Sequence, residues 1–480
     1  MTLTRSWPVL LAPTLLTGAA LAGCSLAPPY ARPSSPEAVQ WKPVEGWQPA
    51  APADDAPRGD WWTTFGDGAL NDLVVRANAH NQTLAQADAT YRQAHALTRE
   101  ARASLFPTVS ATGSVTHSQS GGSRTIVTNG VTSSAGSNSS TSYNVGASAS
   151  WTPDLFGQIR NTVASARYTE QARAADLASA QLAIDGELVT DYLGLRASDA
   201  QIASLAATVA AYQRSLTIAT NRYTAGIVAH SDVFQGQSQL ASAQSDLEAE
   251  KRTRAQLEDA IATLVGENAA AFTLPAIADW KPVIPVVPVA LPSTLLERRP
   301  DIASAERSVA AANAQIGVDR AAFFPSLSLT GNGGFNSDTL KSLFSSASSL
   351  WSVGALLAQT IFDGGARRAR VAADRAAYDA AVANYRQVTL TAFQAVQDNL
   401  AATAILARQE ALLATASAAA DRSEASVRFQ YQSGIVVYSD VVTAQATAFA
   451  ARRALIQIRA DRQTTAAALV QALGGGWAGA

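Results

Sequence analysis

The chain has 480 residues, of which 15% are charged, against about 25% in ordinary soluble domains. Its formal net charge of −2 excludes the strongly basic surface of a nucleic-acid-binding protein. The single cysteine excludes an internal disulfide and a paired-cysteine metal or redox site, and with only four histidines we expect no metal centre.

Residues 1–23 are typical of an export signal, because a short apolar stretch from Val9 to Leu21 precedes small residues and Cys24. Cys24 at this place resembles the cysteine of a bacterial lipobox, so we expect it to carry a covalent lipid and the protein to have no other cofactor. The alternative is an unmodified thiol beside an ordinary cleavage site. Ser25 follows rather than aspartate, which by the bacterial sorting rule predicts the outer membrane. Residues 24–60, rich in Pro, Ala and Asp, are expected to form an extended tether.

The rest of the chain contains an internal repeat. Phe106-Pro107 recurs 218 residues later as Phe324-Pro325, and Gly226-Ile227-Val228 recurs 208 residues later as Gly434-Ile435-Val436. Chance similarity between alanine-rich helices does not readily produce such landmarks in the same order, so we infer a duplication. The predicted parts are a first repeat at 61–270, a proline-rich linker at 271–299, a second repeat at 300–474 and a tail at 475–480.

Each repeat is predicted to contain two strands. Alternating apolar and polar residues with aromatic residues near the ends mark strands at about 106–116, 143–152, 325–333 and 350–361. Gly, Ser, Thr and Asn are abundant between them, which predicts long loops at 117–141 and 332–349. The pattern suits strands of a membrane barrel, but exposed hairpins of a soluble protein would show it as well.

Each repeat is also predicted to contain two long helices, at about 155–224 and 228–268 in the first and 365–432 and 436–473 in the second. Apolar residues recur every three or four positions in a narrow stripe, which is typical of a coiled-coil seam rather than a ligand site. Seventy helical residues would span on the order of 100 Å. The mature chain has no uncharged apolar run long enough for a transmembrane helix.

The strand count constrains assembly. A sheet in lipid must close on itself to satisfy its edges, and four strands are too few to close. Two chains would give about eight strands, and side chains would fill the interior of a barrel of that size. Three chains would give about twelve, the smallest number expected to leave a water-filled channel. The alternative is a lipid-anchored periplasmic coiled-coil scaffold without a pore.

Several motifs point to one family. They are Leu296-Glu297-Arg298-Arg299-Pro300-Asp301-Ile302, Asp60-Trp61-Trp62, Asp154-Leu155-Phe156-Gly157, Phe362-Asp363-Gly364-Gly365 and Ala472-Leu473-Gly474-Gly475-Gly476-Trp477. In these motifs the chain resembles the TolC-like outer-membrane factors, specifically their lipoprotein (NodT-type) branch. The resemblance implies an α+β membrane protein: a homotrimeric channel-tunnel with a twelve-stranded β-barrel, a long periplasmic α-helical barrel and a mixed equatorial domain.

The same resemblance implies the function. It predicts the outer-membrane channel of a tripartite efflux pump, through which small toxic compounds or drugs pass outward. The implied partners are a periplasmic adaptor protein, an inner-membrane pump of the RND type and outer-membrane lipid. We expect no enzyme, because the sequence has no nucleophile elbow, phosphate loop or metal-ligand spacing. Export of proteins by a type I secretion system stays open as an alternative.

The resemblance also locates the channel aperture, at the turns between the paired long helices. Gly226 and Gly434 mark these turns. Asp440 matches one of the family's aperture aspartates, whereas Thr443 stands at the second acidic position and Ser439 replaces a leucine common in the lipoprotein branch. The alternative for Asp440, and the interpretation we prefer for Asp232 in the first repeat, is a carboxylate that stabilises a helix N-terminus.

Overall fold

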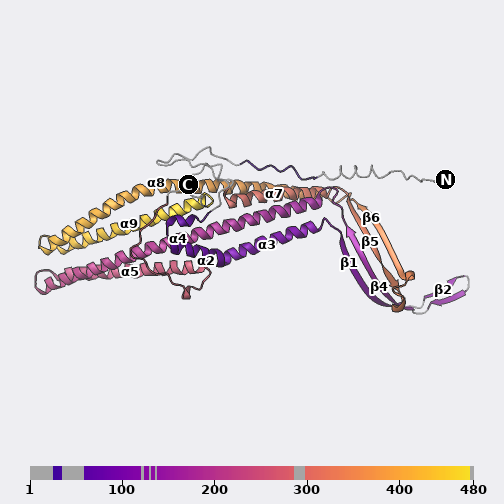
Figure 1. Cartoon of the computed structure of the whole chain (residues 1–480), viewed down its shortest axis with the longest axis horizontal. Helices are drawn as coiled ribbons and strands as arrows, with labels where there is room; N and C mark the ends of the chain where they lie inside the picture. The colour runs from indigo at the N-terminus through magenta and orange to yellow at the C-terminus, as the bar shows by residue number, and fades with distance from the viewer. Residues whose placement is uncertain are drawn as a thin grey trace, which may run out of the picture. The chain divides into compact units, whose positions relative to one another are not determined.

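The computed structural model describes residues 25–34, 59–120, 124–128, 131–135, 138–285 and 298–475. The chain divides into two compact units built from interleaved segments (Figure 1). The first comprises residues 1–32, 93–171 and 307–382, and the second comprises 33–92, 172–306 and 383–480. The predicted signal, Cys24 and the tail beyond residue 475 lie outside the described residues.

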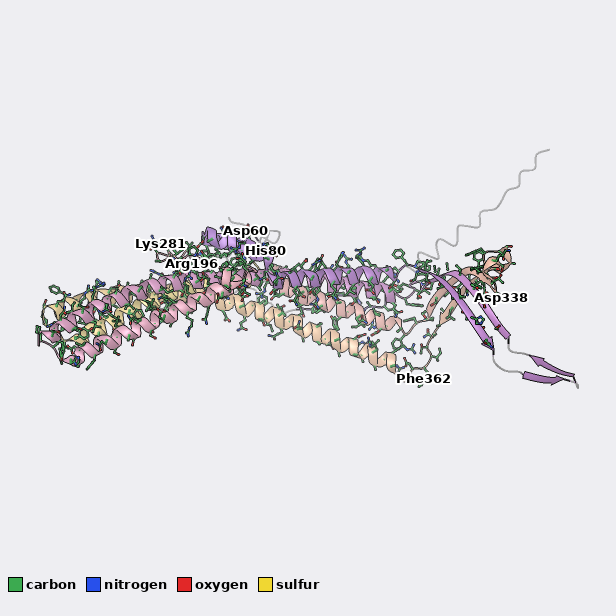
Figure 2. All side chains as sticks on the ribbon, turned by 90° about the horizontal axis from the view of Figure 1, so that it is seen from below. Asp60, His80, Arg196, Lys281, Asp338 and Phe362 are labelled. Atoms are coloured by element: carbon green, nitrogen blue, oxygen red, sulfur yellow. The ribbon has the colours of Figure 1, made fainter. Side chains whose placement is uncertain are left out.

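The first unit contains a four-stranded antiparallel sheet in the order β1-β4-β5-β6. The strands are β1 (Thr108–Ser120), β4 (Asn138–Trp151), β5 (Ser326–Ser337) and β6 (Ser349–Ala358). Phe362 lies at the end of the sheet where the helices begin, and Asp338 lies at the opposite end (Figure 2). Within the described residues, β1 and β6 are each paired along one edge only.

Two glycines hold the middle of this sheet together. Gly146 of β4 pairs with Gly334 of β5. A Cβ atom on Gly334 would lie 2.5 Å from the carbonyl oxygen of Val145 and 2.7 Å from the Cα of Gly146. Such an atom would push the strand backbones apart, so the close pairing of the two repeats depends on glycine at this position.

The two predicted loops contain more structure than expected. Within 117–141, where we predicted a loop, β1 continues to Ser120, β4 starts at Asn138, and β2 (Arg124–Thr128) pairs with β3 (Val131–Ala135). Within 332–349, β5 continues to Ser337, and two short turns of helix, η3 (Leu340–Ser342) and η4 (Ser346–Ser348), lead into β6. Ser and Thr are common in strands as well as in loops, so composition alone placed these boundaries wrongly.

The helices are long and nearly uninterrupted. They are α2 (Gly68–His80), α3 (Gln82–Ala103), α4 (Gln158–Thr224), α5 (His230–Leu264), α7 (Pro300–Ala321), α8 (Ala366–Gln432) and α9 (Tyr438–Ala472). Asp67 caps α2 by accepting hydrogen bonds from the backbone N–H groups of Ala69 and Leu70. None of the helices in the described part of the chain is both long and apolar enough to cross a bilayer.

The second unit is built around one large apolar core. It contains Trp61, Trp62 and Phe65 of the helix η1 (Trp61–Phe65), together with apolar residues of α2, α4, α5, α8 and α9. Within it Tyr192 donates a hydrogen bond to Asp67 at 2.6 Å. The Trp61-Trp62 motif therefore contributes large aromatic side chains to the core of the second unit.

A cluster of two buried and two half-buried charges lies beside this core. We call Arg196, Asp199, Arg254 and Glu258 the Asp199 cluster; Arg196 is labelled in Figure 2. Asp199 accepts hydrogen bonds from Arg196 at 2.9 Å and from Arg254 at 2.6 Å, and Arg196 and Asp199 are only 1% and 3% exposed.

The Asp199 cluster also holds the backbone that follows α5. Arg196 donates to the carbonyl oxygen of Pro275, and Arg254 donates to that of Leu274. Asp199 in turn accepts from the backbone N–H of Ile277 at 3.0 Å. The start of the proline-rich linker is therefore fixed to α4 and α5 by charge-assisted hydrogen bonds.

The beginning of the predicted tether is bonded to helices. Residues 25–32, which we call the N-terminal strap, have no helix or strand but are bonded to helices of the first unit. Asn313 of α7 donates to the carbonyl oxygen of Pro28 at 2.9 Å, and Tyr30 packs against Tyr168 with ring centroids 6.3 Å apart. Composition predicted an extended segment, but it did not show that helix side chains supply partners for the strap backbone.

Candidate aperture at the helix-hairpin turns

Two helix hairpins end in turns of the same construction. In the α4–α5 turn, Gly226 N–H donates to Tyr223 O at 2.8 Å and Ile227 N–H donates to Arg222 O at 2.9 Å. In the α8–α9 turn, the N–H groups of Gly434 and Ile435 donate to Tyr431 O and Gln430 O at 3.0 and 2.9 Å. These bonds satisfy carbonyl groups left free at the helix ends.

The conformation of both turns requires glycine. Gly226 has φ of 71° and Gly434 has φ of 76°, in the left-handed region that side chains disfavour. Each turn is followed directly by the next helix, and an aspartate lies in the first turn of that helix, Asp232 in α5 and Asp440 in α9. The two glycines, which mark the turns in both repeats, are thus required by the positive φ of the backbone there.

The predicted aperture residues lie together on the first turns of α9. Ser439, Asp440 and Thr443 are all exposed in the single chain. The hydroxyl of Thr443 donates to the carbonyl oxygen of Ser439 at 2.9 Å, so it is engaged within the helix. The backbone N–H of Asp440 donates to Val437 O at 3.2 Å, and its exposed carboxylate is in the position where a helix N-terminus stabilises negative charge.

Asp232 has different surroundings, although it is the counterpart of Asp440 in the first repeat. It is half-buried, and its charge acts on Tyr431 and Tyr438 of the second hairpin. Burial, then the neighbouring Tyr431, then the charge of Asp232 raise the pKa of Tyr438 to about 12. Asp232 therefore lies toward the contact between the two hairpins, whereas Asp440 is exposed.

An arginine joins the two hairpins near their turns. Arg222 of α4 donates to the carbonyl oxygen of Tyr431 at 2.8 Å, and its guanidinium lies 4.6 Å from the centroid of the Tyr431 ring. The Tyr431 and Tyr438 rings are 5.5 Å apart. Both tyrosines are buried with Ala219 and Val441 in a small apolar cluster, which fixes the second hairpin to the first.

Gly236 of α5 completes this contact. A Cβ atom at Gly236 would lie 2.8 Å from the Tyr438 hydroxyl. About two helical turns further along α9, Gln445 donates to the hydroxyl of Ser215 at 3.1 Å, and this bond is buried. Opening the turns relative to one another would therefore have to break a specific set of contacts rather than separate two smooth surfaces.

Sequence reasoning missed Arg222, Tyr431 and Tyr438, although the repeat contained a signal for the tyrosines. The 208-residue spacing aligns Tyr223 with Tyr431 and His230 with Tyr438. In the first hairpin the corresponding rings stack with centroids 4.5 Å apart, and His230 also lies 4.2 Å from the Phe234 ring. The first aromatic set is exposed and the second buried, a difference that the repeat alone does not predict.

The Arg299-Pro300-Asp301 part of the sharpest motif has a structural role in the second unit. The Arg299 guanidinium donates to both carboxylate oxygens of Asp301, at 3.0 and 2.7 Å. It also donates to the carbonyl oxygen of Ala472 at 2.8 Å, in the last turn of α9. The motif therefore joins the start of α7 to the end of α9, the first and last helices of the second repeat.

Comparison with known proteins gives consistent matches over nearly the whole chain. The profile of the family described as outer membrane efflux protein matches residues 73–267 and 291–475. The antibiotic efflux pump outer membrane protein ArpC of Pseudomonas putida is 34% identical over 96% of this chain and 94% of its own length. The toluene efflux pump outer membrane protein TtgC of the same species is 33% identical over the same shares. The solved structure of the outer-membrane channel OprN superposes with a TM-score of 0.84 at 28% identity, covering 95% of this chain and 100% of that one.

Proposed function

Since the chain belongs to the outer membrane efflux protein family, we propose that it forms the exit channel through which an efflux pump expels small toxic compounds. The chain is the outer-membrane component of an efflux system, and its fold is that of the outer-membrane channels. The family is one of channel proteins rather than enzymes, and we propose that the chain has no catalytic activity. Antibiotics and small aromatic solvents, named for two relatives, are the proposed cargo.

The working unit in this proposal is a homotrimer. The observation that carries it is the four-stranded sheet, in which β1 and β6 are unpaired along one edge within the described residues. Val109, Trp351, Val353 and Leu356 are among its exposed apolar side chains. A second and third copy would pair these edges and close the sheet in lipid.

A periplasmic adaptor and an inner-membrane RND-type pump are the proposed partners. The hairpin turns support this proposal, since they expose Ile227, Ile435 and Val437 at the ends of helices too long to be needed for a membrane anchor alone. Exposed apolar side chains gathered at one end are typical of a protein-binding surface. A channel that receives cargo from a pump needs a contact of this kind at its periplasmic end.

Deleting the gene and restoring it tests the efflux function. We expect the deletion strain to accumulate a fluorescent efflux dye and to become sensitive to antibiotics and toluene, and the wild-type gene to reverse both effects. Unchanged sensitivity combined with loss of a secreted protein would instead indicate type I secretion. Failure of a membrane-impermeant reagent to label residues 117–141 on intact cells would indicate a periplasmic scaffold.

A lipid on Cys24 is the proposed anchor. Two or three acyl chains hold a protein in a bilayer stably, which a single chain does not. We expect Cys24→Ser to abolish incorporation of radiolabelled palmitate, because the sequence has no other cysteine. Labelling that persists in this variant would show that the lipid is attached elsewhere. The variant is expected to retain trimers, since barrel closure does not require the lipid.

Asp440 is the proposed selectivity residue of the aperture. Three exposed carboxylates facing one another near the turns would concentrate cations, as acidic rings do in cation-selective pores. Asp440→Asn is expected to reduce both cation selectivity and block by trivalent cations in planar-bilayer recordings. Asp232→Asn is the matched control, because Asp232 is half-buried whereas Asp440 is exposed, and it should change either property far less. Equal effects of the two substitutions, or none from Asp440→Asn in a normally inserting protein, would rule out the aperture role.

A further inference from the structure

The N-terminal strap brings the start of the mature chain to a defined place in the first unit. Ser25 donates a hydrogen bond from its hydroxyl to Asn161 of α4 at 3.0 Å. Arg320 of α7 donates to the carbonyl oxygen of Leu26 at 3.4 Å. Ala27 packs so closely over Gly317 that a Cβ atom on that glycine would lie 2.7 Å from the Ala27 Cβ. Cys24, the proposed lipid site, immediately precedes these bonded residues.

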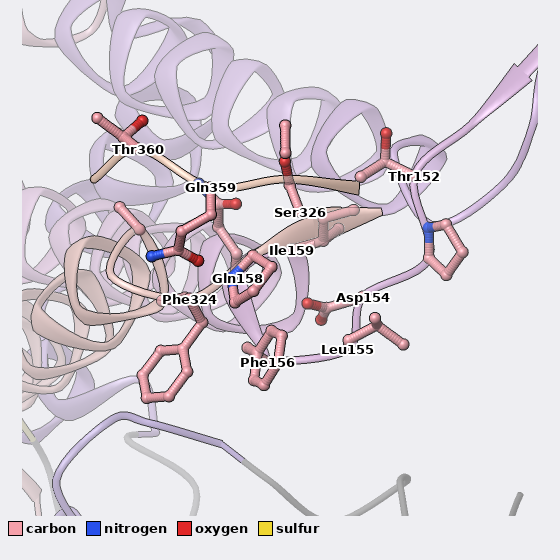
Figure 3. A pocket seen from close by; sticks show the side chains of 15 residues that line it. Thr152, Asp154, Leu155, Phe156, Gln158, Ile159, Phe324, Ser326, Gln359 and Thr360 are labelled. Atoms are coloured by element: carbon pink, nitrogen blue, oxygen red, sulfur yellow. The ribbon is translucent and has the colours of Figure 1, made fainter. Parts of the chain in front are cut away.

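A cavity of about 300 Å³ lies in the same unit, where β4 leads into α4 and α7 leads into β5. Its apolar lining includes Pro153, Leu155, Phe156, Ile159 and Phe324. Figure 3 shows Phe156 and Phe324 side by side, and their rings stack with centroids 4.9 Å apart. Phe324 is 43% exposed, so the cavity has an accessible aromatic edge.

Two of the polar side chains that line this cavity, Asp154 and Gln359, already have partners. Asp154 accepts from both the backbone N–H and the side chain of Arg160, at 2.8 and 3.1 Å. Gln359 donates to the carbonyl oxygen of Phe323 at 2.8 Å. A cationic ligand would find the Asp154 carboxylate occupied by Arg160, whereas an apolar chain would need only the exposed faces of the aromatic and aliphatic side chains.

The start of the strap is bonded to helix residues that are close in the chain to the cavity lining. Asn161, the partner of Ser25, is two residues from Ile159, which lines the cavity. Arg320, the partner of Leu26, directly precedes Ala321, which also lines it. Both anchoring residues thus lie within one helical turn of the lining, one on α4 and the other on α7.

We propose that an acyl chain of the lipid on Cys24 occupies this cavity, packed against Phe156 and Phe324. The inference rests on the proposed lipidation of Cys24. Each methylene group removed from water contributes about 0.8 kcal/mol, and the strap lowers the cost of binding because Ser25 and Leu26, which follow Cys24 in the chain, are already bonded to α4 and α7. The lipid then does more than anchor the chain. It also joins the strap to the place where β4 leads into α4 and α7 leads into β5.

Photocrosslinking tests the proposal in the full-length protein. Cells supplied with palmitate that carries a diazirine would incorporate it into Cys24 and into phospholipids, and irradiation would couple each chain to its neighbours. We expect mass spectrometry to find the Cys24 peptide joined to the tryptic peptide that ends at Arg160 or to the one that begins at Ala321. Cys24→Ser should abolish these products.

A pair of adjacent substitutions supplies the matched control. Ala322 lines the cavity, so Ala322→Trp should fill it and strongly reduce the two crosslinks. Phe323 is next to it in the chain and packs on Arg367 with 5.4 Å between the guanidinium and the ring centroid, not on the cavity. Phe323→Trp should leave the crosslinks unchanged.

Other outcomes would overturn the proposal in distinguishable ways. Phospholipid adducts on the same two peptides that persist in Cys24→Ser would show that bulk lipid fills the cavity. A lipidated Cys24 that crosslinks only to phospholipid would show that its acyl chains lie in the bilayer. An unmodified Cys24 peptide before irradiation would refute the lipidation itself, and the cavity proposal with it.

Discussion

Replacing Asp199 with alanine is expected to lower the free energy of unfolding by about 3–5 kcal/mol, the usual cost of breaking a buried ion pair from one side. Asp199 is 3% exposed and accepts from Arg196, Arg254 and the backbone of Ile277. Its removal would leave two guanidinium groups without their shared carboxylate. The Nε atom of Arg196 is already buried without a hydrogen-bond partner, so Arg196 would be left without a carboxylate, whereas Arg254 would keep its pair with Glu258 at 3.0 Å.

The melting temperature of the detergent-solubilised protein, followed by tryptophan fluorescence, would measure this loss. Limited proteolysis should also cut near residues 274–277, which the Asp199 cluster holds in place. Asp421→Ala is the control, because Asp421 pairs with Arg452 at the surface. The Asp421 side chain is 44% exposed and that of Arg452 is 34% exposed. Surface pairs contribute about 0–1 kcal/mol. Similar losses in both variants would contradict a special role for the buried cluster.

Asp185→Asn is expected to stabilise the protein, by an amount that depends on pH. Asp185 of α4 is 4% exposed and accepts from Asn78 of α2 at 2.9 Å. Burial above all, and the nearby charge of Asp60, raise the pKa of Asp185 from 3.8 to about 7. Between these values the folded chain binds a proton that the unfolded chain releases, so the free energy of unfolding falls as pH rises from about 4 to about 7.

Asparagine mimics the protonated side chain and should remove this dependence. The gain in stability should be near zero at pH 4 and reach about 4 kcal/mol per chain above pH 7, which is roughly three pKa units at 1.36 kcal/mol each. Melting temperatures from pH 5 to pH 8 would reveal the divergence from wild type. Asp398→Asn changes an exposed position on α8. Its melting temperature should therefore change with pH in parallel with that of the wild type. Curves that are parallel for Asp185→Asn as well would show that Asp185 is ionised in the folded protein throughout.

The sequence predicted the long helices closely, because their signals are long and periodic. The first was expected at about 155–224 and is found at Gln158–Thr224, and the third was expected at about 365–432 and is found at Ala366–Gln432. Pro153 and the left-handed glycine Gly365 precede these starts. The strand ends were less predictable, since Ser, Thr, Asn and Gly fill both the strands and the loops of this sheet.

The candidate aperture was predictable only at positions where the backbone conformation requires one residue type. Gly226 and Gly434 stood out because their Gly-Ile-Val segment recurs after 208 residues, and the structure shows that both adopt positive φ in matching turns. Arg222 carried no comparable signal, since an arginine in an alanine-rich helix is usually a solvated side chain. Its partner is the carbonyl oxygen of Tyr431, 209 residues away, and such a contact depends on how two hairpins pack. The cavity beside the N-terminal strap was likewise invisible, because its lining comes from three separate segments.

The unequal burial of the two aromatic pairs has an evolutionary consequence. Tyr431 and Tyr438 are 4% and 2% exposed, so most substitutions there are removed by selection for folding. Tyr223, His230 and Phe234 are exposed at the matching place in the first half, where change leaves the fold intact. After the inferred duplication, the aromatic residues of the second turn thus kept their role in packing, whereas those of the first turn became free to diverge. Substitutions at these three positions are therefore expected to change the exposed surface of the first turn without requiring a compensating mutation elsewhere.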